Sequence, residues 1–309
     1  MHATEFSAAD CEGPLAGRGR GADEGTAQPS WVMGAPPSQP AQNPVPLGVD
    51  AADLAEYSLM LGDDALLLAH RLSDWGVRAP GLAESSALLS ICLDLLEQAR
   101  ALLSRAAELT ATGADRLAYR RDSGEFRNVR LAEIDCGPGP GGDFTATVAR
   151  LLLFATWRRA LFDRLTGTSD PVLAAVARRH RAKLRAAQEH AARWVVEFGT
   201  GELSRRRRVL AALHRVWPLA GELFSPHPVE LRLAAAGAAV DPESVRGEVA
   251  GAVARVLAAA DLQLPDLAQL RAAGRCGRYG VHTESMPFVL AELQHLFRAD
   301  PVELEPPTP

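Results

Sequence analysis

The chain has 309 residues, of which 47% are hydrophobic, and this is enough to bury a substantial core in one large domain or two small ones. Its formal net charge is −5 and its pI about 5.9, so no basic bias indicates binding to nucleic acid or to an anionic membrane. The sequence shows neither an apolar run of about 18 residues nor an N-terminal signal pattern, so we expect a cytoplasmic protein with no membrane partner. The four cysteines lack metal-type spacing, and we expect them to be reduced: Cys11, Cys92, Cys136 and Cys276.

Both ends of the chain are predicted to be disordered tails. Residues 1–49 are rich in Pro, Gly, Ala and Ser, and residues 301–309 are rich in Pro. Such segments cannot bury enough apolar area to offset the conformational entropy that ordering would cost. The folded part is therefore expected to be one helical domain over residues 50–300.

Apolar residues recur at helical spacing along this domain. The pattern predicts a first helix that begins near Asp50 and stops at "WGVRAP" (75–80), and further helices over about 80–110, 143–166, 170–199, 202–220, 241–260 and 283–297. Asp170-Pro171 and Asp241-Pro242 are typical helix starts, because Asp caps the first turn and Pro fits inside it. The helix at 80–110 is apolar nearly all round, which predicts a central position.

Seven helices with long central members predict an all-α fold, a ferritin-like four-helix bundle with accessory C-terminal helices. The connection between the second and third helices is long enough to cross the bundle, as a ferritin-like topology requires. No internal repeat of fixed period is visible.

Two polar segments interrupt the helical pattern. The first polar segment, "YRRDSGEFRNVRLAEI" at residues 119–134, is crowded with charge, contains a Ser-Gly turn and has no helical apolar stripe. The second polar segment is "GRYGVHTE" at residues 277–284. The sequence alone leaves open whether these segments form a site or a surface.

A ferritin-like bundle raises the question of a di-iron centre. Such a centre takes a carboxylate from each of two helices and a Glu-x-x-His pair from each of the other two. Asp64 lies at the edge of the first apolar stripe, and Asp94 and Glu97 have the pair's spacing with the wrong second residue. Lys183 and Ala187 stand where the fourth helix should supply its pair. We interpret these five as degenerate ligand positions and expect neither a metal nor a catalytic residue on this chain.

Other motifs carry little chemistry. The one Glu-x-x-His in the chain, Glu292–His295, has no partner pair, and we interpret it as chance. His180 lies on an apolar face and is expected to be a packed, hydrogen-bonded core histidine. Phosphate-loop and Gly-x-Ser-x-Gly motifs are absent, and the glycine-rich "GPGPGGD" at 137–143 is not a convincing dinucleotide-binding motif, because its two prolines lack the N–H groups that a phosphate cradle uses. The arginine run at 205–208 is expected to face solvent or an acidic partner.

Several stretches resemble one family in order along residues 50–298. They are "YSLMLGDDALLLAHRLSDW" (57–75), "LLSICLDLLEQARALL" (88–103), the first polar segment, "GDFTATVARLLLFATW" (142–157), "ARWVVEFGTG" (192–201), "VWPLAGELF" (216–224) and "GRYGVHTESMPFVLAELQ" (277–294). Together they resemble the C subunits of bacterial phenylacetyl-CoA 1,2-epoxidases. Around residues 183–190 the chain departs from that family, which usually has more His and acid there.

The resemblance implies a ferritin-like fold and a structural, non-catalytic role. It implies a catalytic A subunit as partner, which carries the di-iron centre, together with a B subunit and a reductase that passes electrons from NADPH. The implied reaction is epoxidation of the ring of phenylacetyl-CoA with dioxygen. No cofactor is implied on this chain.

The polar segments are then hypothesised to be a partner surface. Guanidinium groups can bind a carboxylate through two parallel hydrogen bonds, which fixes orientation as well as affinity. The residues are Arg120, Arg121, Asp122, Glu125, Arg127 and Asn128, with Arg278, His282, Thr283 and Glu284 as a second patch. A local role is equally compatible, with Asp122 and Ser123 forming a turn and Thr283 capping the last helix.

Three other functions stay open at this point. One is an autonomous di-iron enzyme, which lacks the ligands. Another is a stand-alone acyl-CoA-binding module, for which the arginine run is the densest basic candidate. The third is a divergent paralogue that serves another oxygenase.

Overall fold

The computed structural model describes residues 43–137, 143–272, 274 and 276–299. Within these ranges the regular structure is helical and contains no strand, which confirms the all-α prediction. Most of residues 1–49 and all of 301–309, the predicted tails, lie outside the described residues. Residues 43–49 are described, and the Arg105 guanidinium donates hydrogen bonds to the carbonyl oxygens of Asn43 at 2.8 Å and Pro44 at 3.4 Å.

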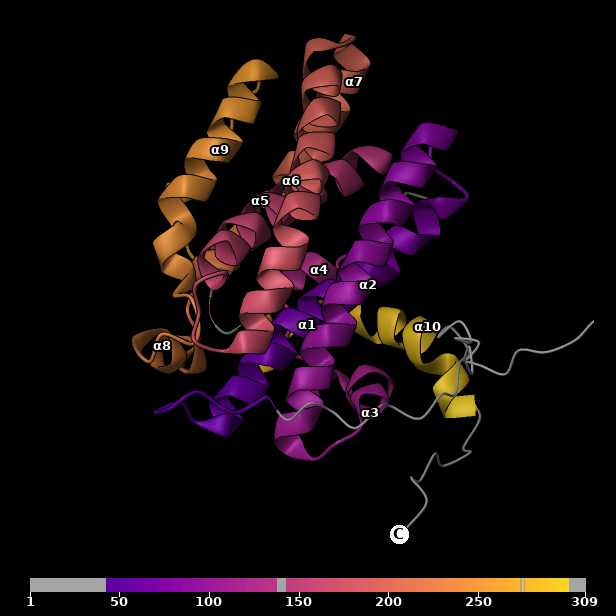
Figure 1. Cartoon of the computed structure of the whole chain (residues 1–309). Helices are drawn as coiled ribbons and strands as arrows, with labels where there is room; N and C mark the ends of the chain where they lie inside the picture. Colours follow the sequence, from indigo (N-terminus) through magenta and orange to yellow (C-terminus); the bar gives the residue numbers. More distant parts are fainter. Residues whose placement is uncertain (1–42, 138–142, 273, 275, 300–309) are drawn as a thin grey trace, which may run out of the picture. The chain divides into compact units, whose positions relative to one another are not determined.

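Four long helices form the bundle: α1 (Ala51–Ser73), α2 (Leu82–Thr110), α5 (Phe144–Leu165) and α6 (Pro171–Thr200). Helices α1 and α2 pack along each other, as do α5 and α6, and α2 also packs against α6 (Figure 1). The connection from α2 to α5 contains the short helices α3 (Ala114–Tyr119) and α4 (Arg130–Glu133). The four-helix bundle and its long crossing connection are thus as predicted.

Aspartates set where three of the long helices begin. Asp50 accepts hydrogen bonds from the backbone N–H groups of the first turn of α1, and Asp143 does the same for α5. Asp170 caps α6 and is also buried against Arg105, whose guanidinium lies 2.7 Å from its carboxylate. An Asp cap satisfies N–H groups that have no partner within the helix.

Helix α5, rather than α2, is the central helix. Every residue from 144 to 158 is buried. Helix α2 instead leaves four leucines exposed on one face, at spacings of seven, four and three residues: Leu82, Leu89, Leu93 and Leu96. The prediction of a central α2 is wrong because these leucines make the helix apolar without being buried. We call these four residues the leucine stripe.

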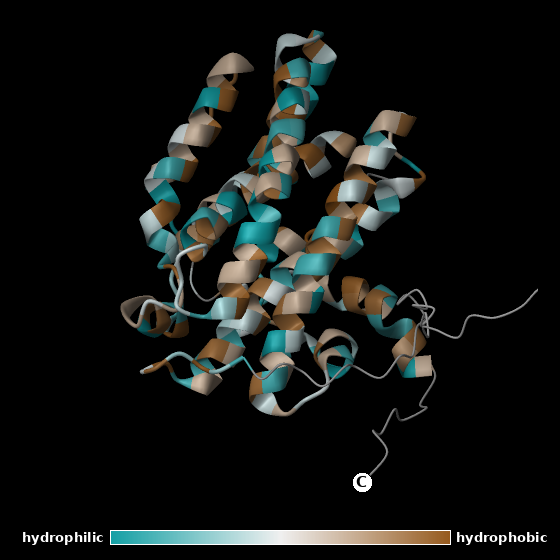
Figure 2. Ribbon diagram, in the orientation of Figure 1, coloured by the Kyte–Doolittle hydropathy of each residue, from teal (hydrophilic) through white to brown (hydrophobic). Residues whose placement is uncertain are grey.

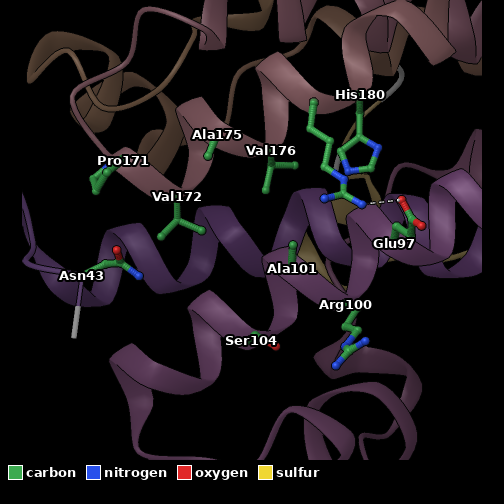
Figure 3. A pocket seen from close by; sticks show the side chains of 11 residues that line it. Asn43, Glu97, Arg100, Ala101, Ser104, Pro171, Val172, Ala175, Val176 and His180 are labelled. Carbon is green, nitrogen blue, oxygen red and sulfur yellow. Dashed lines mark ion pairs between the residues drawn. The ribbon is translucent and has the colours of Figure 1, made fainter. Parts of the chain in front are cut away.

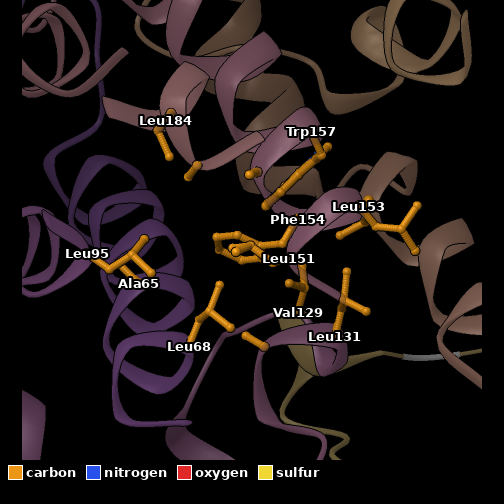
Figure 4. Close-up of a cluster of buried hydrophobic side chains, with 14 of the residues drawn as sticks. Ala65, Leu68, Leu95, Val129, Leu131, Leu151, Leu153, Phe154, Trp157 and Leu184 are labelled. Atoms are coloured by element: carbon orange, nitrogen blue, oxygen red, sulfur yellow. The ribbon is translucent and has the colours of Figure 1, made fainter. Parts of the chain in front are cut away.

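Side chains from several elements meet between the long helices. Figure 4 shows Ala65 and Leu68 of α1, Leu95 of α2, Phe154 of α5 and Leu184 of α6 in one buried cluster. Figure 2 shows the mixed hydropathy along each long helix, as expected of helices that bury one face.

Accessory helices surround the bundle. Helices α7 (Leu203–Ala220) and α9 (Arg246–Ala259) pack on α5 and α6, whereas α8 (Pro228–Ala235) and α10 (Met286–Ala299) pack on α1. Short 3₁₀ turns cover Asp74–Gly76, Ser123–Glu125, Gly221–Phe224, Pro242–Val245, Leu267–Gln269 and Gly277–Tyr279. The last helix begins three residues later than predicted, so Thr283 belongs to the turn before it.

Two further properties of the described chain bear on its function. None of its helices has the combined length and apolarity needed to cross a lipid bilayer. Cys92, Cys136 and Cys276 are free and buried, as expected of reduced cysteines, and Cys11 lies outside the described residues.

Candidate functional site: buried charges of the bundle

The two polar segments lie against each other. Arg278 of the second segment donates a hydrogen bond to the carbonyl oxygen of Arg127 at 2.6 Å, and His282 Nε2 lies 3.2 Å from the carbonyl oxygen of Phe126. A Cβ atom at Gly277 would overlap the carbonyl oxygen of Asn128. Only glycine permits this approach of the two backbones.

Both segments bind neighbouring aspartates of α1. Asp63 and Asp64 are fully buried. The Arg121 guanidinium donates hydrogen bonds to both carboxylate oxygens of Asp63. Asp63 also accepts a hydrogen bond from the Arg127 backbone N–H at 2.9 Å. A bidentate guanidinium gives a carboxylate two charge-assisted hydrogen bonds and fixes its orientation.

Asp64 is held by the second segment in the same way. Arg278 donates to its two oxygens at 3.0 and 2.9 Å, and the Val129 N–H donates at 2.7 Å. Burial by itself would lower the pKa of Arg278, but the charges of Asp64 and Glu230 and the hydrogen bond to Asp64 together outweigh it and raise that pKa above its ordinary value. Arg278 therefore keeps its charge at neutral pH although it is buried.

A second guanidinium approaches Asp64 from the central helix. Arg158 of α5 is fully buried, 3.7 Å from Asp64, and it donates to Gln98 Oε1 at 2.8 Å and to the Leu61 carbonyl at 2.9 Å. Burial lowers the pKa of Arg158 to about 10, which still leaves it charged at neutral pH. Gln98 in turn donates to Asp94 at 2.8 Å, and Asp94 lies 2.7 Å from His180 Nδ1, so polar contacts continue from Asp64 on α1 to His180 on α6.

Two glutamates hold the polar segments together. Buried Glu133 accepts hydrogen bonds from Asn128 at 2.7 Å and the Thr283 N–H, and it lies 2.7 Å from His282 Nδ1. Glu222 accepts from Arg130 at 2.8 Å and from the Gly277 N–H at 3.0 Å. Each carboxylate thus joins parts of the chain that are far apart in sequence.

These contacts correct the predicted partner surface at four of its ten residues. Arg121, Asn128 and Arg278 are buried inside this chain, and His282 is bound to Glu133, so these four cannot present a free docking face. Their sequence pattern is misleading because charge without an apolar stripe normally means solvent. Arg120, Asp122, Glu125 and Glu284 are exposed, and Arg127 and Thr283 are partly exposed. Asp122, Ser123 and Glu125 form the expected local turn, in which Glu125 accepts the Asp122 N–H at 2.8 Å.

A second group of charges lies between α2 and α6. Its members are Asp94, Glu97, His180 and Lys183, which we call the lysine cluster. His180 is buried with Nδ1 at 2.7 Å from Asp94, as expected of a hydrogen-bonded core histidine. Lys183 Nζ lies 3.1 Å from Asp94 and 3.3 Å from Glu97.

The lysine cluster keeps its acids ionised. Burial pushes the pKa of Asp94 upward, but hydrogen bonds from His180 and Lys183 outweigh it and hold the pKa below its ordinary value. The hydrogen bond that Lys183 donates to Glu97 lowers the pKa of Glu97, and the one that it donates to Asp94 raises the pKa of Lys183. The three charged groups therefore coexist at neutral pH.

The bundle does not fit a di-iron centre. Of the degenerate positions, Asp64 is bound by Arg278, Ala187 is buried in the apolar core, and Lys183 is a cation. The central helix α5 contributes Arg158 near Asp64, where a third helix would be expected to bring a carboxylate. Hydrophobic side chains such as Phe154 and Leu184 are buried between the helices (Figure 4).

The lone Glu-x-x-His pair has a local role. Glu292 lies 3.3 Å from His70 Nε2 and 3.9 Å from Arg71 of α1, while His295 Nδ1 lies 2.8 Å from the carbonyl oxygen of Glu292. The two side chains do not converge on one point, in agreement with the interpretation as chance.

A pocket of about 550 Å³ lies beside the lysine cluster, in the groove between α2 and α6. Figure 3 shows Glu97, Arg100 and Ala101 of α2 facing Val172, Val176 and His180 of α6 across it. Arg179 also lines the pocket and makes an ion pair with Glu97 at 3.5 Å. The pocket is apolar at one end and charged at the other.

Sequence reasoning missed Glu133, Glu222 and Arg158. Glu222 lies in a stretch that the sequence analysis used only for the family resemblance, and Arg158 directly follows another such stretch. Glu133 is one charged residue among many in the first polar segment. The available signal for Arg158 was its position, because it falls four residues after Phe154 and therefore shares a helix face with it.

Comparison with known proteins agrees with this architecture. The family of phenylacetic acid catabolic proteins matches residues 44–303. The chain is 36% identical over 249 residues to the C subunit of 1,2-phenylacetyl-CoA epoxidase from Escherichia coli (strain K12), covering 80% of this chain and 97% of that protein. This confirms the resemblance found in the sequence and the ferritin-like fold that it implied. The chain belongs to the phenylacetic acid catabolic protein family, and within phenylacetate catabolism it groups with the C subunits of the epoxidase.

Proposed function

We propose that this chain is the structural C-type subunit of a 1,2-phenylacetyl-CoA epoxidase complex and performs no chemistry itself. The proposal rests on the similarity to the C subunit from Escherichia coli, because that similarity spans nearly the whole of the bacterial protein. The charges of the bundle support the non-catalytic part. Arg158 and Lys183 place cations where oxygenase chemistry would need metal ligands.

The remaining parts of the complex follow from this role. A catalytic A subunit would carry the di-iron centre, a B subunit would complete the assembly, and a reductase would deliver electrons from NADPH. The substrate would be phenylacetyl-CoA, epoxidised on its ring with dioxygen. No cofactor is assigned to the present chain.

The leucine stripe supports a partner-binding role. Leu82 is 87% exposed and Leu93 is 62% exposed, on the outer side of a helix that spans the bundle. Four large apolar side chains aligned on one helix face are more than the scattered exposed residues of an ordinary surface. We assign this face to contact with the A subunit.

The exposed members of the polar segments form a second proposed contact. Arg120, Asp122, Glu125 and Glu284 remain accessible, whereas their neighbours are fixed in the core. The buried Arg121 and Arg278 would hold this surface in one conformation, which lowers the entropy that binding must cost.

Co-expression with the A subunit tests the proposal. Size-exclusion chromatography and metal analysis should show a stable complex whose iron stays with the A subunit when the two are separated. Iron bound stoichiometrically by this chain alone would refute the non-catalytic role. Failure of the two chains to co-elute, with each one folded, would refute the assignment to the complex.

The pocket favours a second candidate, direct binding of an acyl-CoA. Arg100 and Arg179 line its charged end, and guanidinium groups are suited to phosphates. Calorimetric titration of the isolated chain with phenylacetyl-CoA tests this. Binding that weakens about tenfold or more in Arg100→Ala, which removes one charge-assisted contact, would support it; absence of heat would dismiss it.

A further inference from the structure

Three metal-ligand side chains converge in the lysine cluster. One donor atom from each of Asp94, Glu97 and His180 lies within 4.8 Å of the others. Two carboxylates and one imidazole are a donor set that Zn²⁺ and related divalent ions accept, with water in a fourth position.

Lys183 stands at the place that such an ion would take. Its ammonium contacts both carboxylates, and it sits three residues after His180 on α6, facing the pair Asp94 and Glu97 on α2. Residues three apart share a helix face, so each helix offers two groups to the same point. Lysine carries three donors and no acceptor, so it can replace the charge of a metal but cannot bind one.

The choice of lysine here is specific. Of the 33 Lys and Arg residues in the chain, Lys183 is the one lysine. An ammonium is a compact point charge with rotatable donors, whereas a guanidinium is a planar fork. A compact cation is the side chain that most nearly reproduces a bound metal ion between two carboxylates.

Two cations already balance the two carboxylates of the lysine cluster, so the cluster needs no metal ion for neutrality. The ammonium of Lys183 and the guanidinium of Arg179, 3.5 Å from Glu97, match the two carboxylates. Asp94 and His180 are buried, but the Lys183 side chain is 52% exposed and reaches the cluster from outside. Its removal would therefore open the three ligands to solvent without emptying the core.

We propose that the Lys183 ammonium takes the place of a metal ion and closes a divalent-metal site formed by Asp94, Glu97 and His180, and that neutralising it opens this site to Zn²⁺ or Co²⁺. The inference concerns the chain alone and does not depend on complex formation.

The test compares three full-length proteins by Co²⁺ absorbance and Zn²⁺ competition. Lys183→Leu removes the charge and adds no ligand atom, and it should bind one Co²⁺ at least about 100-fold tighter than the wild type, as expected when a cation leaves the site. Lys183→Arg keeps the charge and should bind no tighter than the wild type. Adding Asp94→Asn to Lys183→Leu should abolish the gain. Equal affinity of the wild type and a folded Lys183→Leu would overturn the proposal.

A measurement on the wild type is independent of how the variants fold. Because lysine occurs once, protein labelled with ¹⁵N-lysine gives a single side-chain ammonium signal. That signal should stay unchanged when Zn²⁺ is added to millimolar concentration. A stoichiometric shift or loss of the signal would show that metal displaces Lys183, and would overturn the proposal.

Discussion

Arg278 donates hydrogen bonds to both carboxylate oxygens of Asp64, at 3.0 and 2.9 Å, although 214 residues separate the two in the chain. This pair docks the second polar segment on the first long helix. Arg121 and Asp63, one residue earlier on α1, do the same for the first polar segment. The polar segments are therefore internal supports of the bundle, and only their outer residues are available to a partner.

Replacing Asp64 by asparagine should lower the free energy of unfolding by about 3–5 kcal/mol, because Arg278 and Arg158 would then be buried cations without their shared carboxylate. Urea denaturation of the two proteins measures the difference. Asp115→Asn, at an exposed position in α3, is the control and should change stability by less than about 1 kcal/mol. Equal stability of Asp64→Asn and wild type would mean that the buried charges need no counterion.

Gly277→Ala should prevent the polar segments from docking. The added Cβ would overlap the carbonyl oxygen of Asn128, and backbone on both sides would have to move. We expect a loss of at least about 3 kcal/mol, comparable to overpacking a core. The matched control is Gly247→Ala in α9, where nothing lies within 4 Å of the new methyl and helix propensity should add up to about 1 kcal/mol. Thermal unfolding of both variants measures these changes.

Glu133→Gln should loosen the second polar segment without unfolding the bundle. The amide cannot accept from Asn128, His282 and the Thr283 N–H together, because one of its two terminal atoms is a donor. Amide hydrogen exchange should rise by about tenfold or more across residues 277–284 while α5 remains protected, which corresponds to about 1.4 kcal/mol of lost local stability. Unchanged exchange in that segment would contradict the role given to Glu133.

Charges placed on the leucine stripe should abolish complex formation. Leu89→Glu combined with Leu93→Glu would put two carboxylates into an apolar interface, where desolvation is costly, and co-elution with the A subunit should weaken at least about 100-fold. The chain itself should stay folded because both side chains face outward. Ala258→Glu, exposed on α9 across the bundle in Figure 1, is the control and should leave the complex intact. Co-elution of the double variant at wild-type strength would locate the interface elsewhere.

The pH dependence of stability should reveal Glu230 of α8. Burial raises the pKa of this carboxyl in the folded chain. The carboxyl therefore makes its full contribution to folding stability below the ordinary pKa of glutamate, and this contribution is lost as the pH rises through the folded pKa. Glu230→Gln keeps an acceptor for the His227 N–H and should therefore become progressively more stable than wild type as the pH is raised from 4 to 7. Denaturation at several pH values measures this, with exposed Glu197→Gln as the control. A constant difference across that range would contradict it.

The helices could be predicted from sequence because their signals are local. Asp50, Asp143 and Asp170 mark starts that the structure confirms, and the apolar spacing fixes where each long helix runs. The error over α2 has a physical cause. Apolar residues show what a helix can bury, but they do not show whether this chain or a second one covers them.

The polar segments could be located but not interpreted from sequence. Arg278 appears exposed when read with its polar neighbours, and nothing local indicates that Asp64 lies within reach. Long-range pairing of charges depends on tertiary placement, which periodicity does not encode. The lysine cluster was only half visible for the same reason, since its two halves lie on different helices.

The pairing of Asp64 with Arg278 also sets an order of assembly. Synthesis runs from the N-terminus, so α1 emerges long before the residue that balances its carboxylate, and domains fold as units in that direction. Until residue 278 has left the ribosome, closing the bundle would bury Asp64 without its guanidinium fork. Completion of the native bundle is thus coupled to completion of the chain, and a product truncated before the second polar segment would remain open to chaperones and proteases.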